Sequence, residues 1–307
     1  MHTSRLTIAG LILGVFFVSL TAIGTWQPSG ALGVLTAADS VDTLFQALLT
    51  ATITGVTLVI TISQLVLSQE LGAVGDQQRR LEGAMDFQHD FEELSGLDVT
   101  PAEPSEFFRS LLEQIADRVD RILEILSLDE ACTDALADIR QRARSLSVEL
   151  DGAEFGGFGV VGLALEFDYS RMILEVRSIL NRQTESEGEA GRAATRELNE
   201  LLQMFGVARE HFKTLFFQWQ LTELSRRIMI SAVPAILASA SMLAYFRSED
   251  FAGATLGVSH ANLLVTATTT VSLAPFAILV AYMARIMTVT QKTLSIGPFL
   301  LRSTEDA

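Results

Sequence analysis

The sequence predicts an all-α integral membrane protein in which four transmembrane helices, arranged two and two, flank a cytoplasmic helical bundle. Long helices are expected to continue from the second span and into the third. Three observations predict this class. Of the 307 residues, 49% are hydrophobic and only 19% are charged, against about 25% charged in an ordinary soluble domain. The apolar residues form two long stretches near each end of the chain, and the acidic residues lie between them.

The first pair of spans occupies residues 6–25 and 44–67. Neither stretch contains a charged residue. Each is long enough to cross a hydrocarbon core of about 30 Å, which takes roughly 20 apolar residues in a helix. Arg5 precedes the first stretch, so a cleaved signal peptide is the alternative interpretation of it. Because a second span follows after a short polar loop, we expect residues 1–68 to hold two transmembrane helices and an extracellular loop.

The middle segment, residues 69–227, has the composition of a soluble domain. It contains 31 acidic and 17 basic residues, which accounts for nearly all of the net charge of −15. Apolar residues recur at spacings of three or four from Phe107 to Ile125, the period of an amphipathic helix. Ser105 would cap this helix. Further helices are expected at 76–94, 129–150, 163–182 and from 193 onward.

The first and last of these helices are expected to join the membrane spans directly. Gly72 and Gly75 are the strongest breakers between span two and the helix at 76–94, and Gly206 is the strongest breaker before span three. Glycine disfavours a helix interior by only about 1 kcal/mol. The sequence therefore predicts a cytoplasmic bundle connected to the spans by continuous helices.

The second pair of spans occupies residues 228–246 and 263–287, followed by a tail at 288–307. Each span contains one proline, Pro234 and Pro275. A proline removes a backbone N–H and kinks a membrane helix, which is tolerated where neighbours satisfy the freed carbonyl. The kinks either serve packing or act as hinges.

Basic residues near the spans predict the orientation, because cytoplasmic flanks carry an excess of Lys and Arg. The loop at 26–43 has none, and the loop after span three has only Arg247. The basic residues at the other ends of the spans are Arg5, Arg79, Arg80, Arg226, Arg227, Arg285, Lys292 and Arg302. We expect a multi-pass plasma-membrane protein with both termini and the middle segment in the cytoplasm.

The most informative pattern is a polar stripe within span two. Its members follow at intervals of three and four residues, which places them on one helix face about five turns long. They are Thr50, Thr54, Thr57, Thr61, Gln64 and Ser68. Such hydroxyls either bond their own helix and pack against a partner helix, or line a wet pathway in an oligomer.

Span four adds hydroxyl residues that are more scattered around the helix. They are Thr266, Thr268, Thr269, Thr270 and Ser272. A polar interior shared by spans two and four is therefore expected. The apolar centres of the spans contain no ionisable side chain, and this disfavours a self-contained proton pump, which needs an intramembrane acid or base.

A weaker pattern lies on the helix after span two, where carboxylates and an imidazole share one face. These residues are Glu82, Asp86, His89, Asp90 and Glu93. Carboxylate oxygens suit Ca²⁺ or Mg²⁺, and the histidine would admit a transition metal. A solvated acidic face, or a surface that attracts cations, is the alternative in a chain this acidic.

Composition excludes several function classes. The chain has 37 acidic against 22 basic residues, so nucleic acid is not an expected partner. Only two lysines are present, Lys213 and Lys292, and this acidic, lysine-poor composition indicates a halophilic, archaeal source. The single cysteine, Cys132, rules out an internal disulfide. No hydrolase, metalloprotease or P-loop motif occurs in the sequence, and neither enzymatic activity nor a cofactor is expected.

The order of two spans, a large cytoplasmic helical domain and two further spans resembles bestrophin-type channels and the MotA and TolQ class of ion-driven stators. The resemblance is one of topology and carries over no site residue. The leading hypothesis is a homo-oligomeric, ion-conducting pore in the lipid bilayer, with the span-two stripe facing the axis and the acidic bundle as a vestibule for inorganic ions. The alternatives are a stator-like subunit that needs a partner helix, and a non-conducting scaffold or sensor that binds a cytoplasmic protein.

Overall fold

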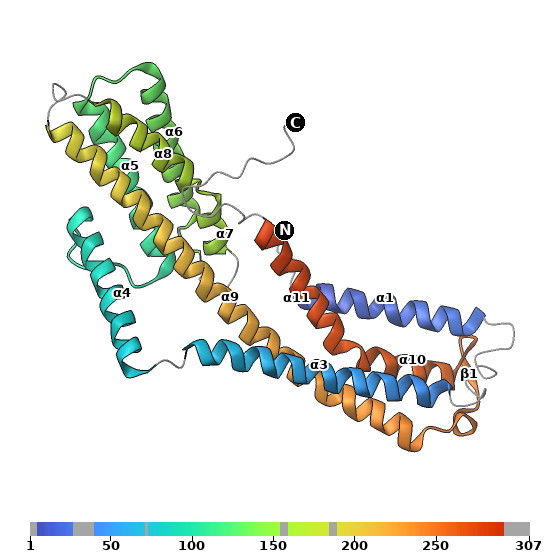
Figure 1. The fold of residues 1–307 in the computed structure, drawn as a ribbon. Helices are drawn as coiled ribbons and strands as arrows, with labels where there is room; N and C mark the ends of the chain where they lie inside the picture. The colour runs from blue at the N-terminus through green and yellow to red at the C-terminus, as the bar shows by residue number, and fades with distance from the viewer. Residues whose placement is uncertain (1–4, 27–39, 71–72, 154–158, 184–188, 292–307) are drawn as a thin grey trace. The chain divides into compact units, whose positions relative to one another are not determined.

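The computed structural model of the chain describes residues 5–26, 40–70, 73–153, 159–183 and 189–291 (Figure 1). Within these ranges the chain is helical apart from short connections, one 3₁₀ turn and one small hairpin, which confirms the all-α class. The chain divides into two compact units. The apolar unit comprises Met1–Leu71 and Gln218–Thr288, and the acidic unit comprises Gly72–Phe217 together with Val289–Ala307. Most of the expected tail lies outside the described residues.

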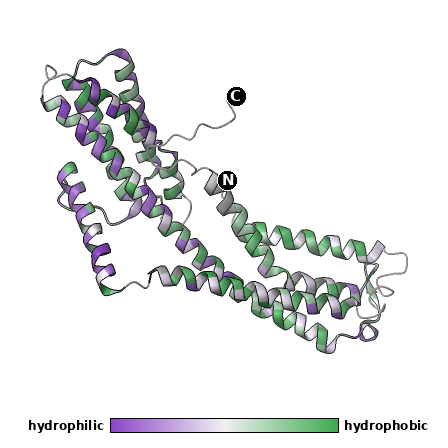
Figure 2. Cartoon of the chain, in the orientation of Figure 1, coloured by the Kyte–Doolittle hydropathy of each residue, from purple (hydrophilic) through white to green (hydrophobic). Residues whose placement is uncertain are grey.

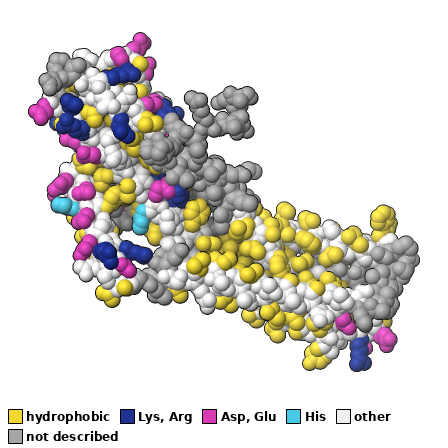
Figure 3. All heavy atoms as spheres, in the orientation of Figure 1, with side chains coloured by type: hydrophobic (Ala, Val, Ile, Leu, Met, Phe, Trp, Pro, Cys, Tyr) yellow, Lys and Arg dark blue, Asp and Glu magenta, His cyan; other side chains and the backbone are white. Residues whose placement is uncertain are grey.

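The apolar unit contains α1 (Arg5–Trp26), α3 (Ser40–Glu70), the C-terminal part of α9 (Glu189–Tyr245), α10 (His260–Ser272) and α11 (Ala274–Gln291). Three of these helices, α1, α3 and α9, are long and apolar enough to cross a membrane, and α10 with α11 makes a fourth candidate if the bent pair counts as one span. Apolar residues run along these helices (Figure 2) and cover most of the visible face of this unit (Figure 3). The chain is therefore a membrane protein, as predicted.

The fourth predicted span consists of two helices rather than one. α10 and α11 are separated by Leu273 and differ in direction by 45°. Pro275 has no N–H with which to bond the carbonyl of Val271. The N–H of Phe276 bonds the carbonyl of Leu273 at 3.1 Å, so the helix does not resume its regular pattern across the break. The kink predicted from Pro275 is present, and it begins two residues earlier.

The two expected helix continuations have opposite outcomes. α9 runs unbroken for 57 residues through Pro234, which confirms a continuous helix leading into the third candidate span. The continuation after span two is wrong, because α3 ends before Ala73 and α4 (Val74–Ser95) begins after it. The backbone of Ala73 is extended, with φ −60° and ψ 154°. Gly72 and Gly75 stand close by in the sequence, and each glycine disfavours a helix interior by about 1 kcal/mol.

Small apolar clusters hold the apolar unit together. Two of them fix α3, and in order along the helix they contain Val41, Phe45, Met242 and Val265, then Val59, Leu224, Ile228 and Tyr282. A third joins α1 to α11 through the small side chains of Ala9, Ala277 and Ala281. Small side chains let membrane helices approach closely, which strengthens their dispersion contacts.

A short extended connection joins α9 to α10. It contains the 3₁₀ turn η2 (Ser248–Phe251) and the strands β1 (Ala254–Thr255) and β2 (Val258–Ser259), which pair antiparallel. The turn between the strands uses positive φ angles at Leu256 (55°) and Gly257 (81°). The Ser259 side chain then caps α10 by accepting the N–H of Asn262.

The acidic unit contains α4, α5 (Pro104–Ile125), α6 (Glu130–Glu149), α7 (Gly159–Glu166), α8 (Tyr169–Arg182) and the N-terminal part of α9. One large apolar cluster draws on all six helices and is rich in phenylalanine. The periodic residues predicted to face this core are buried from Phe107 to Ile122, whereas Ile125 at the end of α5 is exposed. A helical bundle with one core is thus present in the acidic segment.

Two local predictions in the acidic unit are wrong. Ser105 does not cap α5: the cap position is Glu103, which makes no side-chain hydrogen bond, and Pro104 occupies the first turn. Pro has a fixed φ that suits the first helical position. The single helix expected at 163–182 is two helices, because the Asp168 side chain accepts the N–H of Arg171 at 3.4 Å and starts α8 anew.

Ion pairs join the helices of the acidic unit. Asp120 on α5 accepts hydrogen bonds from Arg140 at 2.7 Å and from Arg144 on α6. Arg171 on α8 donates to Asp138 on α6 at 2.7 Å. The hydrogen bond from Arg171 holds the pKa of the Asp138 carboxyl below its ordinary value, although partial burial opposes the shift.

Candidate functional site

The polar stripe predicted in span two lies on one uninterrupted helix. Thr50, Thr54, Thr57, Thr61, Gln64 and Ser68 all belong to α3, and all six are exposed. Among the parts of the chain that the structure describes, no other helix therefore covers them. Packing against another described helix of the same chain, one form of the first explanation of the stripe, is therefore not observed.

The buried residues of α3 occupy the opposite face. Phe45, Thr52 and Val59 recur every seven residues and have exposed fractions of 0%, 1% and 8%. Successive residues of an α-helix are rotated by about 100°, so Thr50 and Thr54 each lie on the far side of the helix from Thr52. The stripe therefore points away from the helices that hold α3 in place.

Several stripe hydroxyls bond the backbone of their own helix. Thr57 Oγ1 donates to the carbonyl of Ile53 and Thr61 Oγ1 to the carbonyl of Thr57, both at 2.9 Å. Ser68 Oγ donates to the carbonyl of Leu65 at 2.7 Å. A hydroxyl that has donated its hydrogen still offers lone pairs. The stripe consequently presents acceptor oxygens outward, together with the Gln64 amide.

Two apolar ridges flank the stripe. On one side lie Leu58 and Leu65, each 60% exposed, and on the other lie Ile53, Ile60 and Leu67, which are also exposed. The rotation of about 100° per residue places the two ridges on either side of the polar face. α3 thus presents a narrow polar strip between two apolar strips on the surface of a single chain.

The structure also contains buried hydroxyls that the stripe does not include. Thr52 of α3, Ser239 of α9 and Thr269 and Ser272 of α10 are all at least 95% buried. Ser239 Oγ and Ser272 Oγ are hydrogen-bonded at 2.9 Å. Span four was expected to share a polar interior with span two, but the α3 residue on this side is Thr52. The seven-residue spacing of Thr52 from Phe45 and Val59 is present in the sequence, but Thr52 was not predicted to be a site residue.

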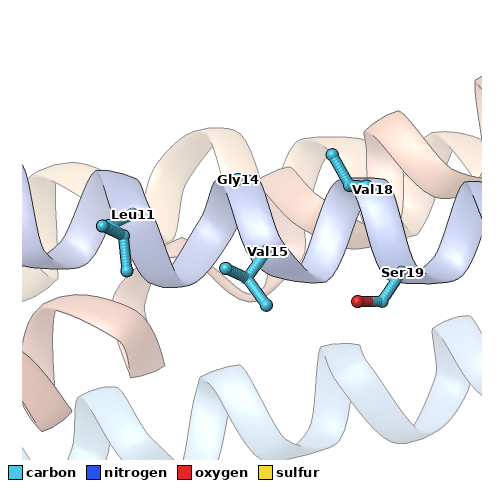
Figure 4. A pocket seen from close by; sticks show the side chains of 5 residues that line it. All are labelled: Leu11, Gly14, Val15, Val18 and Ser19. Atoms are coloured by element: carbon cyan, nitrogen blue, oxygen red, sulfur yellow. The ribbon is translucent and has the colours of Figure 1, made fainter.

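A shallow depression on α1 is lined by Leu11, Gly14, Val15, Val18 and Ser19 (Figure 4). Val15 and Ser19 project from the same side of the helix. Ser19 supplies the one polar side chain of the five, and all five residues come from a single helix. Such a lining lacks the convergent polar groups that mark a small-molecule site.

The five residues considered for metal binding lie on α4. Glu82, Asp86, His89, Asp90 and Glu93 are all exposed, and His89 Nε2 lies 3.4 Å from Glu93 Oε1. Among the residues that the structure describes, no group of three or more such side chains converges on one point that could hold a metal ion. The pattern therefore reads as a solvated acidic helix face.

Comparison with known proteins gives a family and no activity. No curated protein and no solved structure matches the chain significantly. One family model matches residues 1–307, that is, the entire chain. The chain belongs to this family, DUF7972, which is described as a family of unknown function.

Proposed function

We propose that the chain forms a homo-oligomeric membrane pore in which the stripe of α3 faces the central axis and conducts inorganic ions. The observation that carries the proposal is the exposure of all six stripe residues on the side of α3 opposite its buried face. Against lipid, the Gln64 amide and the outward lone pairs would lose their hydrogen bonds to water, at a cost that hydrocarbon does not offset. A water-filled axis removes this cost.

The two apolar ridges supply the contacts between subunits. In a ring of α3 helices, Leu58 and Leu65 of one subunit would meet Ile53 and Ile60 of the next, while the stripe between them faces inward. These side chains are exposed in the single chain. Association in lipid gains close packing rather than hydrophobic burial, so the ridges need a complementary surface of similar shape, which a second copy provides.

The charge pattern favours cations. The stripe offers oxygen lone pairs and contains no basic residue. Residues 69–227 carry a net charge of −14, and the distribution of Lys and Arg favours a cytoplasmic location for this segment and for both termini. A segment of this charge raises the local concentration of cations. We therefore propose a cation-preferring pathway with an acidic cytoplasmic vestibule.

Cysteine accessibility tests the pore directly. In a Cys132→Ala background, which removes the native thiol, Thr57→Cys and Thr61→Cys should react with a membrane-impermeant thiol reagent when the protein is in liposomes. Leu58→Cys, on the neighbouring ridge, is the matched control and should stay unmodified because lipid or a neighbouring subunit covers it. Equal protection of all three positions would overturn the proposal.

Ion flux gives the second measurement. Liposomes that contain the purified protein should release cations faster than empty liposomes, and modification of Thr57→Cys should reduce the rate. The exposed stripe also suits a stator-like subunit, in which a separate partner helix covers it. In that case the purified protein would be silent, and crosslinking from Thr57→Cys in native membranes would capture a small single-span protein. If the purified protein conducts no ions and crosslinking captures no such partner, the result would favour a non-conducting scaffold.

A further inference from the structure

A layer of hydroxyl groups lies inside the apolar unit, on the face of α3 opposite the stripe. α3 runs alongside α10 and then α11 in the same direction. Phe45 packs in one cluster with Val265, and further along α3 a Cβ atom on Gly55 would contact the ring of Phe276. Thr52 lies between the first contact and the second, as do Thr269 and Ser272 on α10. Ser239 is bonded to Ser272, so all four buried hydroxyls lie in the stretch of the apolar unit between these two contacts.

Two of these hydroxyls have no partner. Among the residues that the structure describes, Thr52 Oγ1 and Thr269 Oγ1 are buried and make no hydrogen bond. Other hydroxyls of the same helices behave differently: Thr57 and Thr61 on α3, and Thr268 and Thr270 on α10, bond a carbonyl of the preceding turn. The Thr52 and Thr269 hydroxyls thus bond neither a carbonyl of their own helix nor any described group on a neighbouring helix. A buried unpaired hydroxyl is unfavourable, which points to a bound group.

The end of α10 adds one backbone oxygen between the same two contacts. The carbonyl of Val271 cannot bond residue 275, which is proline, but it accepts a backbone N–H at the C-terminal cap of α10. The carbonyl of Ser272 loses its donor because the N–H of Phe276 bonds Leu273. The C-terminal end of a helix also carries partial negative charge. In membrane proteins, broken helices with free carbonyls occur where they line a cavity or coordinate a cation.

We propose that this layer binds one dehydrated Na⁺ ion, coordinated by Thr52 Oγ1, Thr269 Oγ1, Ser239 Oγ and the carbonyl oxygen of Ser272. Ser272 donates its hydrogen to Thr268, so Ser239 is the donor of the bond between the two serines and keeps its lone pairs. A cluster of lone pairs beside the negative end of a helix favours a hard cation over water. The site is on the other side of α3 from the stripe and does not depend on the proposed pore.

Thermal unfolding of the full-length protein in detergent tests the site. At constant ionic strength, NaCl should raise the unfolding midpoint relative to choline chloride by about 5 °C at a saturating concentration, and KCl should raise it less. Equilibrium binding of radioactive sodium should saturate at one ion per chain. Neither measurement requires ion flux, so failure of the pore proposal would leave both results unchanged.

Three variants decide where the ion binds. Thr52→Val and Thr269→Val keep the shape of the side chain and remove an unpaired hydroxyl, so both should fold and lose the difference between NaCl and choline chloride. Thr52→Ser should retain the difference. Thr57→Val, on the exposed stripe, is the control and should also retain it. Equal midpoints of the unmodified protein in all three salts would overturn the proposal in favour of buried water, and a sodium response that survives in both valine variants would place the ion elsewhere.

Discussion

A Cβ atom on Gly24 of α1 would lie 2.5 Å from Oδ1 of Asn262 on α10. Asn262 is 5% exposed, and its amide nitrogen donates to the carbonyl of Thr21 at 3.4 Å. Its Oδ1 atom accepts from Thr266 at 3.5 Å. A buried amide thus occupies the space that the glycine leaves open, and this polar contact fixes the end of α1 against α10.

Replacing Gly24 should loosen α1. The added methyl group of Gly24→Ala cannot be accommodated unless the buried amide moves, and overpacking of this kind costs about 1–3 kcal/mol. The unfolding midpoint in detergent should fall. Gly10→Ala is the matched control, because a Cβ atom there meets nothing within 4 Å, and the midpoint of that variant should not fall.

The proposed pore predicts that apolar substitutions in the stripe reduce conduction. Thr57→Leu combined with Thr61→Leu would replace outward lone pairs by methyl groups and make dehydration of the ion more costly. A rate reduced about tenfold corresponds to a barrier raised by about 1.4 kcal/mol. Flux from liposomes measures the effect. Leu58→Ile, on the ridge beside the stripe, should conduct at the rate of the unmodified protein, and an unchanged rate in the double variant would contradict the assignment of the stripe.

Acid should weaken the acidic unit through the pair of Asp138 and Arg171. The hydrogen bond from Arg171 keeps the pKa of Asp138 lower in the folded chain than in the unfolded chain. The unfolded state therefore takes up the proton first. Stability from this group is present above the ordinary carboxyl pKa of about 4 and is lost as pH falls through the folded value.

The measurement is helicity against temperature at several pH values between about 3 and 6. At the upper end of this pH range, Asp138→Asn should have a lower midpoint of thermal unfolding than the unmodified protein. At the lower end, the two midpoints should become equal. The effect should be small, since solvent screens an ion pair with side chains 39% and 35% exposed. Asp134→Asn, an exposed position on the same helix, should show no such convergence.

Two glycines in the acidic unit should respond to alanine in opposite directions. A Cβ atom on Gly206 would lie 2.5 Å from Cε2 of Tyr169, whose ring also stacks beneath the guanidinium of Arg209 at 4.4 Å. Tyr169 is 5% exposed and cannot easily move. Gly206→Ala should therefore destabilise the protein by about 1–3 kcal/mol.

Gly83 provides the opposite case. It lies within α4, where a Cβ atom meets open space, and alanine is favoured over glycine in a helix interior by about 0.5–1 kcal/mol. Gly83→Ala should raise the midpoint. Denaturant unfolding measures both variants, and changes of the same sign would contradict the packing described around Tyr169.

The sequence alone was sufficient to predict a helix and its buried face wherever apolar residues repeat with the period of a helix. The uncharged stretches predicted α1 and α3, the spacing from Phe107 to Ile122 predicted the buried face of α5, and Asp129 marked the start of α6. Hydrophobic burial and membrane insertion depend on such periodic, local composition. The sequence also placed the six stripe residues on one face of α3.

Other features depended on contacts between segments far apart in the chain. The sequence left the stripe of α3 open to packing or to water, because threonine hydroxyls suit both surroundings and have the same spacing in either. Only the packing of Phe45 and Val59 against α9, α10 and α11 turned the stripe outward. The unpaired hydroxyls of Thr52 and Thr269 were likewise visible only in the tertiary structure. Whether a hydroxyl has a partner depends on which helices surround it, and tertiary structure alone decides that.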